Sequence, residues 1–202
     1  MSKRRRLWGI LVALTVGIFA SATFYFVPHW LDLRQRKKVA WAFAKAIEQQ
    51  NFQEAAKWVM KTEREKLSVT PEIIAHAFKI LQLPKMRLVD IEALEKMGFQ
   101  CDMRSFWSVE DRKEPIRVIL MLQQEGKEWK VNFFFTFRRF YWLKFYLSGM
   151  DKIEAYYKAE REAGEILRRL GVKGYVSPVG TVRELGELKG WITPEGWKEK
   201  GD

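Results

Sequence analysis

The first pattern along the chain is a long apolar run. Residues 7–27 carry no charged side chain. A helix of this length rises about 30 Å, which matches the hydrocarbon core of a bilayer. Pro28 directly after the run is a helix-ending residue. The run therefore predicts a transmembrane helix at 7–27, preceded by a short tail at 1–6. The basic residues that flank it are Lys3, Arg4, Arg5, Arg6, Arg34, Arg36, Lys37 and Lys38.

This run can be interpreted as an anchor or as a cleaved signal. Ala20-Ser21-Ala22 has the small-x-small pattern of a signal-peptidase site. The apolar run, however, continues past this site to full spanning length, which favours an uncleaved signal anchor. The short basic tail directly beside the run favours an amino terminus in the cytoplasm. We therefore expect a single-pass protein of the cell membrane with the bulk of the chain outside the cytoplasm.

Helical patterns follow the anchor. Residues 34–50 place apolar side chains at i, i+3, i+4 and i+7, which is typical of an amphipathic helix. Asn51 with Glu54 three positions later is a capping pattern, and it predicts a short helix that ends in the charged stretch 61–66. Thr70 followed by Pro71 predicts the start of a third helix.

After Pro84 the pattern becomes typical of strands. Gly126 lies in a hairpin signal between two of them. In the segment that follows, Trp129 and every second residue to Phe137 are apolar, which predicts a strand. The aromatic run 138–147 is interpreted as an extension of that strand. The expected strands are 86–96, 99–109, 116–124 and 129–137.

The last part of the chain is charged and rich in glycine. Residues 150–170 predict a helix with Ile153, Tyr157, Ile166 and Leu170 as its apolar contacts, and Gly171 as its stop. We expect the rest of the tail to be irregular. The fold class is thus α+β: after the transmembrane helix come three helices packed on a curved antiparallel sheet at 35–147, then a carboxy-terminal helix and tail at 148–202.

Composition at first suggests a nucleic-acid-binding protein. The chain of 202 residues has 36 basic and 25 acidic side chains and a net charge of +11. Residues 1–38 hold eight of the basic residues and one of the acids, so the rest of the chain carries only +4. The excess charge therefore belongs to the flanks of the anchor, where it suits anionic headgroups. The bilayer, and not nucleic acid, is the expected partner.

Residues suited to catalysis are sparse. One cysteine and two histidines exclude a disulfide framework and a cysteine-built metal site, and no phosphate-binding glycine loop occurs, so we expect no metal and no cofactor. Cys101 is interpreted as a small buried apolar residue. Asp90, Asp102 and His76 are the candidate catalytic residues, the aspartates as general bases in a cavity between sheet and helices and His76 as a pocket acid or base. The alternatives are that the aspartates lie on a solvated sheet face or in a cross-strand ion pair, and that His76 is a satisfied or exposed structural histidine.

The aromatic run also supplies a candidate partner surface. Aromatic rings interleaved with cations could stack on bases, dock on a membrane interface or dock on another protein. The simpler interpretation is that the rings are buried in the core. The residues of this candidate surface are Arg138, Arg139, Tyr141, Trp142 and Lys144.

Three short motifs resemble a known superfamily. They are A-F-A-K-A-I at 42–47, N-F-x-E-A-A at 51–56 and G-K-E-W-K-V at 126–131. With the order of elements, they resemble the nuclear transport factor 2-like superfamily, in particular its membrane-anchored bacterial members, over about residues 35–140. The resemblance implies a cone-shaped α+β fold, which hosts isomerases, dehydratases and binding modules. The aspartate–tyrosine pair of its isomerase-like enzymes has no match here.

The overall plan is also similar to that of the inner-membrane scaffold protein of type IV secretion systems. Both have one spanning helix followed by an external domain. The expected function is a non-catalytic extracytoplasmic domain that binds a partner protein or a small ligand. The partner is another membrane or envelope protein, or a second copy of the chain. The alternatives are an isomerase or dehydratase that uses a polar cone pocket, and an assembly scaffold of an envelope complex.

Overall fold

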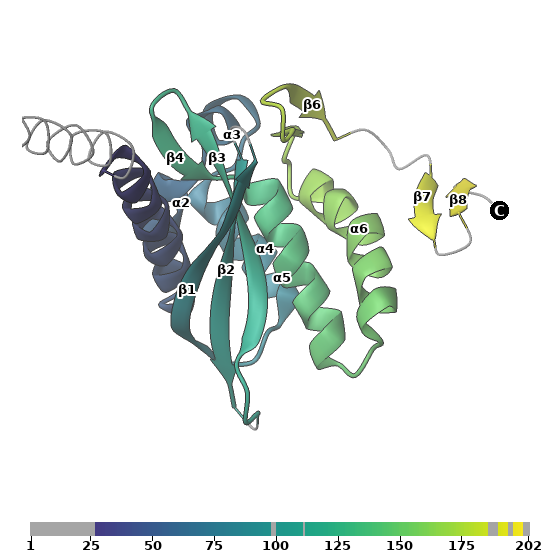
Figure 1. Ribbon diagram of the computed structural model, residues 1–202. Helices are drawn as coiled ribbons and strands as arrows, with labels where there is room; N and C mark the ends of the chain where they lie inside the picture. The colour runs from purple at the N-terminus through teal and green to yellow at the C-terminus, as the bar shows by residue number, and fades with distance from the viewer. Residues whose placement is uncertain (1–26, 98–99, 111, 186–189, 194–195, 200–202) are drawn as a thin grey trace, which may run out of the picture. The chain divides into compact units, whose positions relative to one another are not determined.

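The structure is a computed structural model that describes residues 27–97, 100–110, 112–185, 190–193 and 196–199 (Figure 1). The chain forms two units, Met1–Gln35 and Arg36–Asp202. Residues 27–48 are helical. Apart from Val27, the predicted transmembrane helix lies outside the described residues. Within the described part of the chain, no helix combines the length and the apolar character needed to cross a bilayer.

Three short helices follow, and their starts are set by side-chain caps. They are α2 (Phe52–Trp58), α3 (Lys61–Lys66) and α4 (Pro71–Leu81). The predicted caps are confirmed: the Asn51 Oδ1 atom accepts the Glu54 N–H at 3.1 Å, and the Thr70 Oγ1 atom accepts the Ile73 N–H at 3.3 Å. Each cap satisfies a backbone donor that the first helical turn leaves unpaired.

Helix α3 was not predicted. Its stretch of charged residues lacks a local capping side chain, so the sequence shows only a connection. The cap comes from the end of a distant strand: the Glu125 carboxylate accepts the N–H groups of Lys61 at 2.7 Å and Thr62 at 2.9 Å. The Thr62 hydroxyl also donates to the same carboxylate at 2.7 Å. A tertiary contact therefore starts this helix.

The four-stranded sheet is antiparallel in the order β1-β2-β3-β4. The first three predicted strands are confirmed. Gly126 forms the hairpin turn between the last two strands with φ of 64°, a value that glycine adopts readily. The sheet curls beside the helices in Figure 1. Its strands are β1 (Met86–Met97), β2 (Gln100–Val109), β3 (Ile116–Glu125) and β4 (Glu128–Val131).

The predicted strand at 129–137 is wrong beyond Val131. Helix α5 (Phe133–Leu147) begins there, and so the aromatic run 138–147 continues a helix and not a strand. The buried Asn132 caps α5 through its Oδ1 atom, which accepts the Phe135 N–H at 3.4 Å. Apolar residues occupy almost every side of this helix. Every second residue of its first part is therefore apolar too, and this alternation is the pattern that predicted a strand.

Helix α6 (Lys152–Arg169) confirms the predicted helix at 150–170. Its buried stripe is mostly alanine, which allows a close approach to α5: Ala155, Ala159, Ala163 and Leu167. Ile153, which we expected to be an apolar contact, is instead 62% exposed. It lies beyond the stripe in the first turn. Figure 1 shows α5 and α6 side by side.

The tail is not wholly irregular. After Gly171, whose φ of 93° ends α6 as predicted, the described residues contain two short antiparallel pairs. The first is β5 (Gly174–Val176) with β6 (Val182–Glu184), and the second is β7 (Gly190–Thr193) with β8 (Gly196–Glu199). A Cβ atom at Gly174 would meet the carbonyl oxygen of Arg183 at 2.2 Å, so only glycine fits this first pair.

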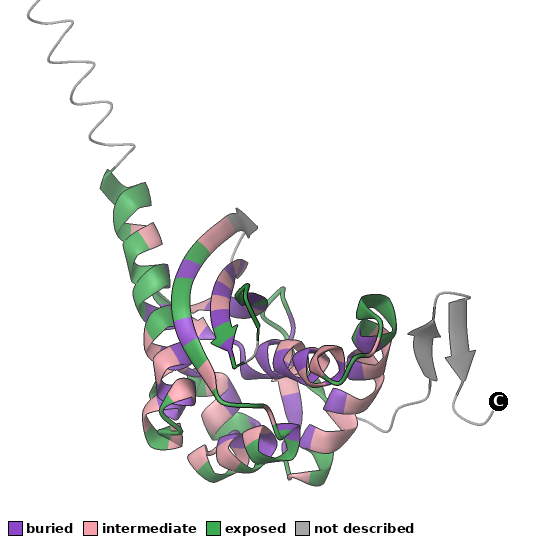
Figure 2. Cartoon of the chain, turned by 90° about the horizontal axis from the view of Figure 1, so that it is seen from below, coloured by how far each residue is buried: buried purple, intermediate pink, exposed green. Residues whose placement is uncertain are grey.

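Large aromatic side chains fill the space between the sheet and the helices. Figure 2 shows the buried residues gathered there. Trp107 of β2 meets Phe140 of α5 edge to face at 5.7 Å, and Phe78 of α4 meets Phe140 at 5.1 Å. The Trp107 indole N–H donates to the Ser105 hydroxyl at 2.8 Å, which in turn donates to the Val118 carbonyl at 2.8 Å. The indole is thereby buried with its polar group satisfied.

A matched pair of cap variants tests how α5 begins. Asn132→Ala removes the cap and also leaves the Gln123 and Val176 carbonyl oxygens without their donor, so we expect a loss of about 3 kcal/mol in the free energy of unfolding. Asn51→Ala removes only an exposed cap and should cost about 1 kcal/mol. Urea unfolding of the full chain in detergent measures both. Equal losses would contradict the role given to Asn132.

Candidate functional site

The three candidate catalytic residues do not come together. Asp90 is exposed on β1, where its carboxylate accepts the N–H of Ile91 at 2.7 Å. Asp102 lies on the face of β2 that points away from the core, and the Gln100 amide donates to it at 3.4 Å. His76 is exposed on α4. The alternative of a solvated sheet face describes the two aspartates, and next to them Arg104 of β2 pairs with Glu92 of β1 at 3.5 Å. His76 fits its own alternative, an exposed structural histidine.

The interior where the resemblance implies a pocket is occupied. The inward side chains of β2 are Cys101, Met103, Ser105 and Trp107. Trp107 contacts the Phe140 ring of α5, and neither Asp90 nor Asp102 is among the buried side chains. Among the residues that the structure describes, no three His, Cys, Asp or Glu side chains gather as a metal-binding cluster.

Cys101 is buried, as we predicted, but its neighbour was not foreseen. The thiol is 1% exposed, and the Arg36 Nη1 atom donates to its sulfur at 2.9 Å. The Arg36 guanidinium also lies 5.6 Å from the centre of the Trp129 ring. The basic pattern around the anchor assigned Arg36 to the headgroups, yet the side chain is only 2% exposed. A basic cluster in the sequence does not reveal which of its members turns inward.

The burial of Cys101 makes a simple prediction. A thiol reagent should leave the native chain unlabelled, because the sulfur is enclosed, and should label it in denaturant. Val179→Cys, at a position that is 78% exposed in the β5–β6 turn, should be labelled in the native chain at once. Mass spectrometry after brief labelling gives the readout. Rapid native labelling of Cys101 would contradict its buried position.

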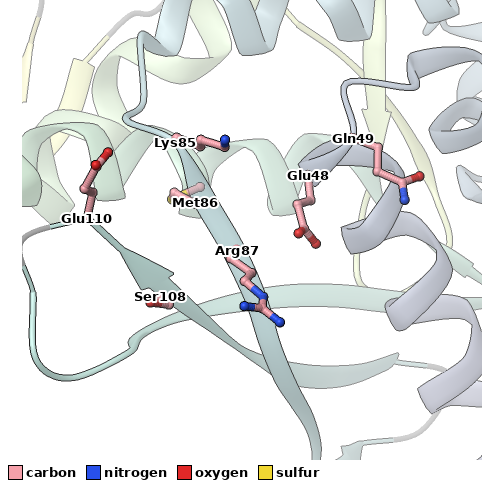
Figure 3. A pocket seen from close by; sticks show the side chains of 7 residues that line it. All are labelled: Glu48, Gln49, Lys85, Met86, Arg87, Ser108 and Glu110. Atoms are coloured by element: carbon pink, nitrogen blue, oxygen red, sulfur yellow. The ribbon is translucent and has the colours of Figure 1, made fainter.

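A surface groove of about 370 Å³ lies where the first strand begins (Figure 3). Its lining combines two acids and two bases with three uncharged residues: Glu48, Gln49, Lys85, Met86, Arg87, Ser108 and Glu110. Arg87 and Ser108 are register partners on β1 and β2, so their side chains share a face of the sheet. Lys45 pairs with Glu48 at 2.8 Å. The groove offers both charges and suits a small polar ligand that carries both.

A buried carboxyl group lies at the start of α5. Glu63 of α3 is fully buried and accepts the backbone N–H groups of Phe133 at 2.7 Å and Phe134 at 3.3 Å. Burial raises the pKa of Glu63 to about 8, against the lowering effect of these two hydrogen bonds. No local sequence signal pointed to this residue, because its partners lie 70 positions further along the chain.

Buried amides continue this polar cluster toward the tail. The Asn132 side chain donates to the side-chain oxygen of Gln123 at 2.9 Å and to the Val176 backbone carbonyl at 2.7 Å. The Gln123 amide then donates to the Ser177 carbonyl at 2.9 Å. The cluster therefore joins α3, β3, α5 and β5. The amide groups of this cluster form hydrogen bonds to each other and to backbone carbonyls of the protein, which indicates a structural role.

The raised pKa of Glu63 has a pH consequence. The unfolded chain releases this proton near pH 4.5, whereas the folded chain keeps it to about pH 8. The free energy of unfolding should therefore fall as the pH rises between these values, and Glu63→Gln should remove that part of the slope. Urea unfolding across this range measures it.

Asp151 supplies the matched control. It caps α6 from an exposed position, and hydrogen bonds from the Ile153 and Glu154 N–H groups lower its pKa. Its contribution is present above its unfolded pKa of 3.8 and is lost only as the pH falls below that value. Asp151→Asn should thus leave the slope above pH 4.5 unchanged. The assignment for Glu63 fails if both variants keep the slope of the parent chain.

The five residues of the candidate partner surface point in different directions. Arg138 lies between α5 and α6, paired with Glu160. Tyr141 is buried and donates to Glu162 at 3.1 Å. Lys144 donates to the Ile80 carbonyl at 3.0 Å, on the side toward α4. Arg139 and Trp142 are the two that share the partly exposed side of α5.

Comparison with known proteins adds no relative: neither the protein-family models nor the curated proteins contain a match to this chain.

Proposed function

We propose that the chain is a single-pass membrane protein whose α+β domain lies outside the cytoplasm and binds a partner through its surface. The observation that carries this proposal is the uncharged run 7–27 between two basic clusters. A soluble helix gains nothing from so long an apolar stretch without a polar side, whereas a bilayer requires it. The positive flanks contribute favourable contact with anionic headgroups.

The first described turns of the helix support a position at the membrane interface. Val27, Trp30 and Leu31 are large apolar side chains that remain exposed. The Arg34 guanidinium lies 5.2 Å from the centre of the Trp30 ring. Tryptophan and basic side chains are typical of the headgroup level, where one end of a residue is apolar and the other is wet. Lys37 is exposed as well and remains available to headgroups.

The filled interior supports binding over catalysis. An isomerase or dehydratase of the cone-shaped type would need a polar pocket between sheet and helices, and Trp107 and Phe140 occupy that space. Asp90, Asp102 and His76 lie outside it. The surface is where a partner protein would bind, and the groove at Glu48 and Arg87 would accommodate a small polar ligand.

Membership of the nuclear transport factor 2-like superfamily remains part of the proposal. Helices followed by a curled antiparallel sheet support it as far as Val131. The chain departs from the expected pattern at Phe133, where α5 replaces the continued strand. A role as an assembly scaffold in the envelope is a form of the same binding function.

A cysteine placed on the domain tests the topology. Val179→Cys should react with a membrane-impermeant maleimide on intact cells, because the β5–β6 turn is exposed and the domain lies outside the cytoplasm. The parent chain, with Cys101 buried, is the matched control and should stay unlabelled. Labelling of position 179 only after lysis would overturn the extracytoplasmic placement.

A further inference from the structure

One side of the α5–α6 hairpin carries a row of aromatic rings. Arg139, Trp142 and Tyr146 share this side of α5, because they are three and four positions apart. The rings of Trp142 and Tyr146 are stacked, with centroids 5.2 Å apart and an interplanar angle of 11°. All three side chains are partly exposed.

Helix α6 continues the same row. The Trp142 indole N–H donates to the backbone carbonyl of Lys152 at 3.1 Å, which places the start of α6 beside the ring. Tyr156 is 39% exposed, and its ring lies 5.5 Å from the Arg139 guanidinium. Ile153 is 62% exposed. We call this surface the aromatic face; it consists of Arg139, Trp142, Tyr146, Lys152, Ile153 and Tyr156.

The cations of the aromatic face outnumber its acids. Arg139 and Lys152 belong to it, and the guanidinium of Arg112 lies 5.2 Å from the Tyr146 ring at its edge. Three acids lie nearby: Glu160 is paired with Arg138, Asp151 caps the start of α6, and Glu154 is exposed in its first turn. Rings with polar ends, an exposed aliphatic side chain and a small excess of positive charge are together the composition of a surface that lies against anionic headgroups.

The geometry favours lipid over single-stranded nucleic acid. Base stacking needs open ring faces. Here Trp142 and Tyr146 cover each other, Arg112 covers Tyr146, and Arg139 covers Tyr156. The ring faces are therefore covered by other side chains of the protein, and neither a base nor a phosphate would bind the exposed aliphatic Ile153. Insertion among headgroups does not need open ring faces, and it buries an aliphatic side chain.

We propose that the aromatic face docks on the anionic headgroup surface of the membrane that anchors the chain. This inference rests on the proposed function, because the anchor holds the domain near the bilayer: the second unit begins at Arg36, a few residues after the apolar run. Tethering makes docking an intramolecular step, so that modest contacts suffice.

The test uses the full chain in vesicles. Ile153→Cys, labelled with an environment-sensitive fluorophore, reports on the aromatic face, and Val179→Cys, labelled in the same way, is the matched control. In phosphatidylcholine vesicles containing phosphatidylglycerol, we expect the emission at position 153 to shift to shorter wavelength. We also expect that probe to be protected from aqueous iodide, with neither change at position 179.

A charge variant sharpens the test. Lys152→Gln removes a cation from the aromatic face at the first position of α6, where loss of positive charge does not weaken a helix. It should lower the ratio of docked to undocked domain by about five-fold, since one basic side chain near an anionic surface contributes about that factor. Pure phosphatidylcholine vesicles should lower the ratio further.

The outcomes separate this inference from the proposed function. Co-flotation of the chain with vesicles is measured first, and a chain that does not float overturns the anchor itself. If the chain floats but iodide quenches positions 153 and 179 equally in both kinds of vesicle, the docking proposal is overturned alone. Protection that follows protein density, or that requires an added oligonucleotide or protein, overturns it in favour of that partner.

Discussion

The fold of the second unit depends on how α5 begins. At Phe133 and Phe134 the backbone N–H groups of the first helical turn are buried, and the Glu63 carboxyl group accepts both. An unpaired buried donor would cost about 1–3 kcal/mol. Asn132 satisfies the next donor of the turn through its side chain. These two residues end the hairpin strand and turn the chain into a helix.

The rest of the unit follows from that turn. Helix α5 crosses to the sheet, where the Thr136 hydroxyl accepts the backbone N–H of Met121 at 3.1 Å. On one side of α5, Phe140 contacts Trp107. On another side, the alanine stripe of α6 packs against the helix. The outer side, with Trp142 and Tyr146, remains toward solvent. Because these caps fix where α5 begins, the helix places Phe140 in the interior and leaves Trp142 and Tyr146 on the outside.

Local signals in the sequence were sufficient for much of the fold. The caps at Asn51 and Thr70, the turn at Gly126 and the stop at Gly171 depend on residues next to the elements that they define, and all four are confirmed. The start of α3 uses Glu125, and the start of α5 uses Glu63 in addition to its own cap Asn132; both glutamates are distant in sequence. No periodicity reports such contacts. The inward turn of Arg36 and the groove at Glu48 were missed for the same reason: each depends on residues that only the fold brings together.

In the proposed function, an apolar anchor holds a domain that binds a partner through its surface. The central requirement of this proposal is that the protein resides in a membrane. Alkaline carbonate extraction of cell membranes tests this most directly, with the full chain compared with a variant that carries Leu14→Arg and Val16→Arg within the run. The full chain should stay in the membrane pellet at its uncleaved size, and the variant should be released. Release of the full chain into the soluble fraction would contradict the anchor.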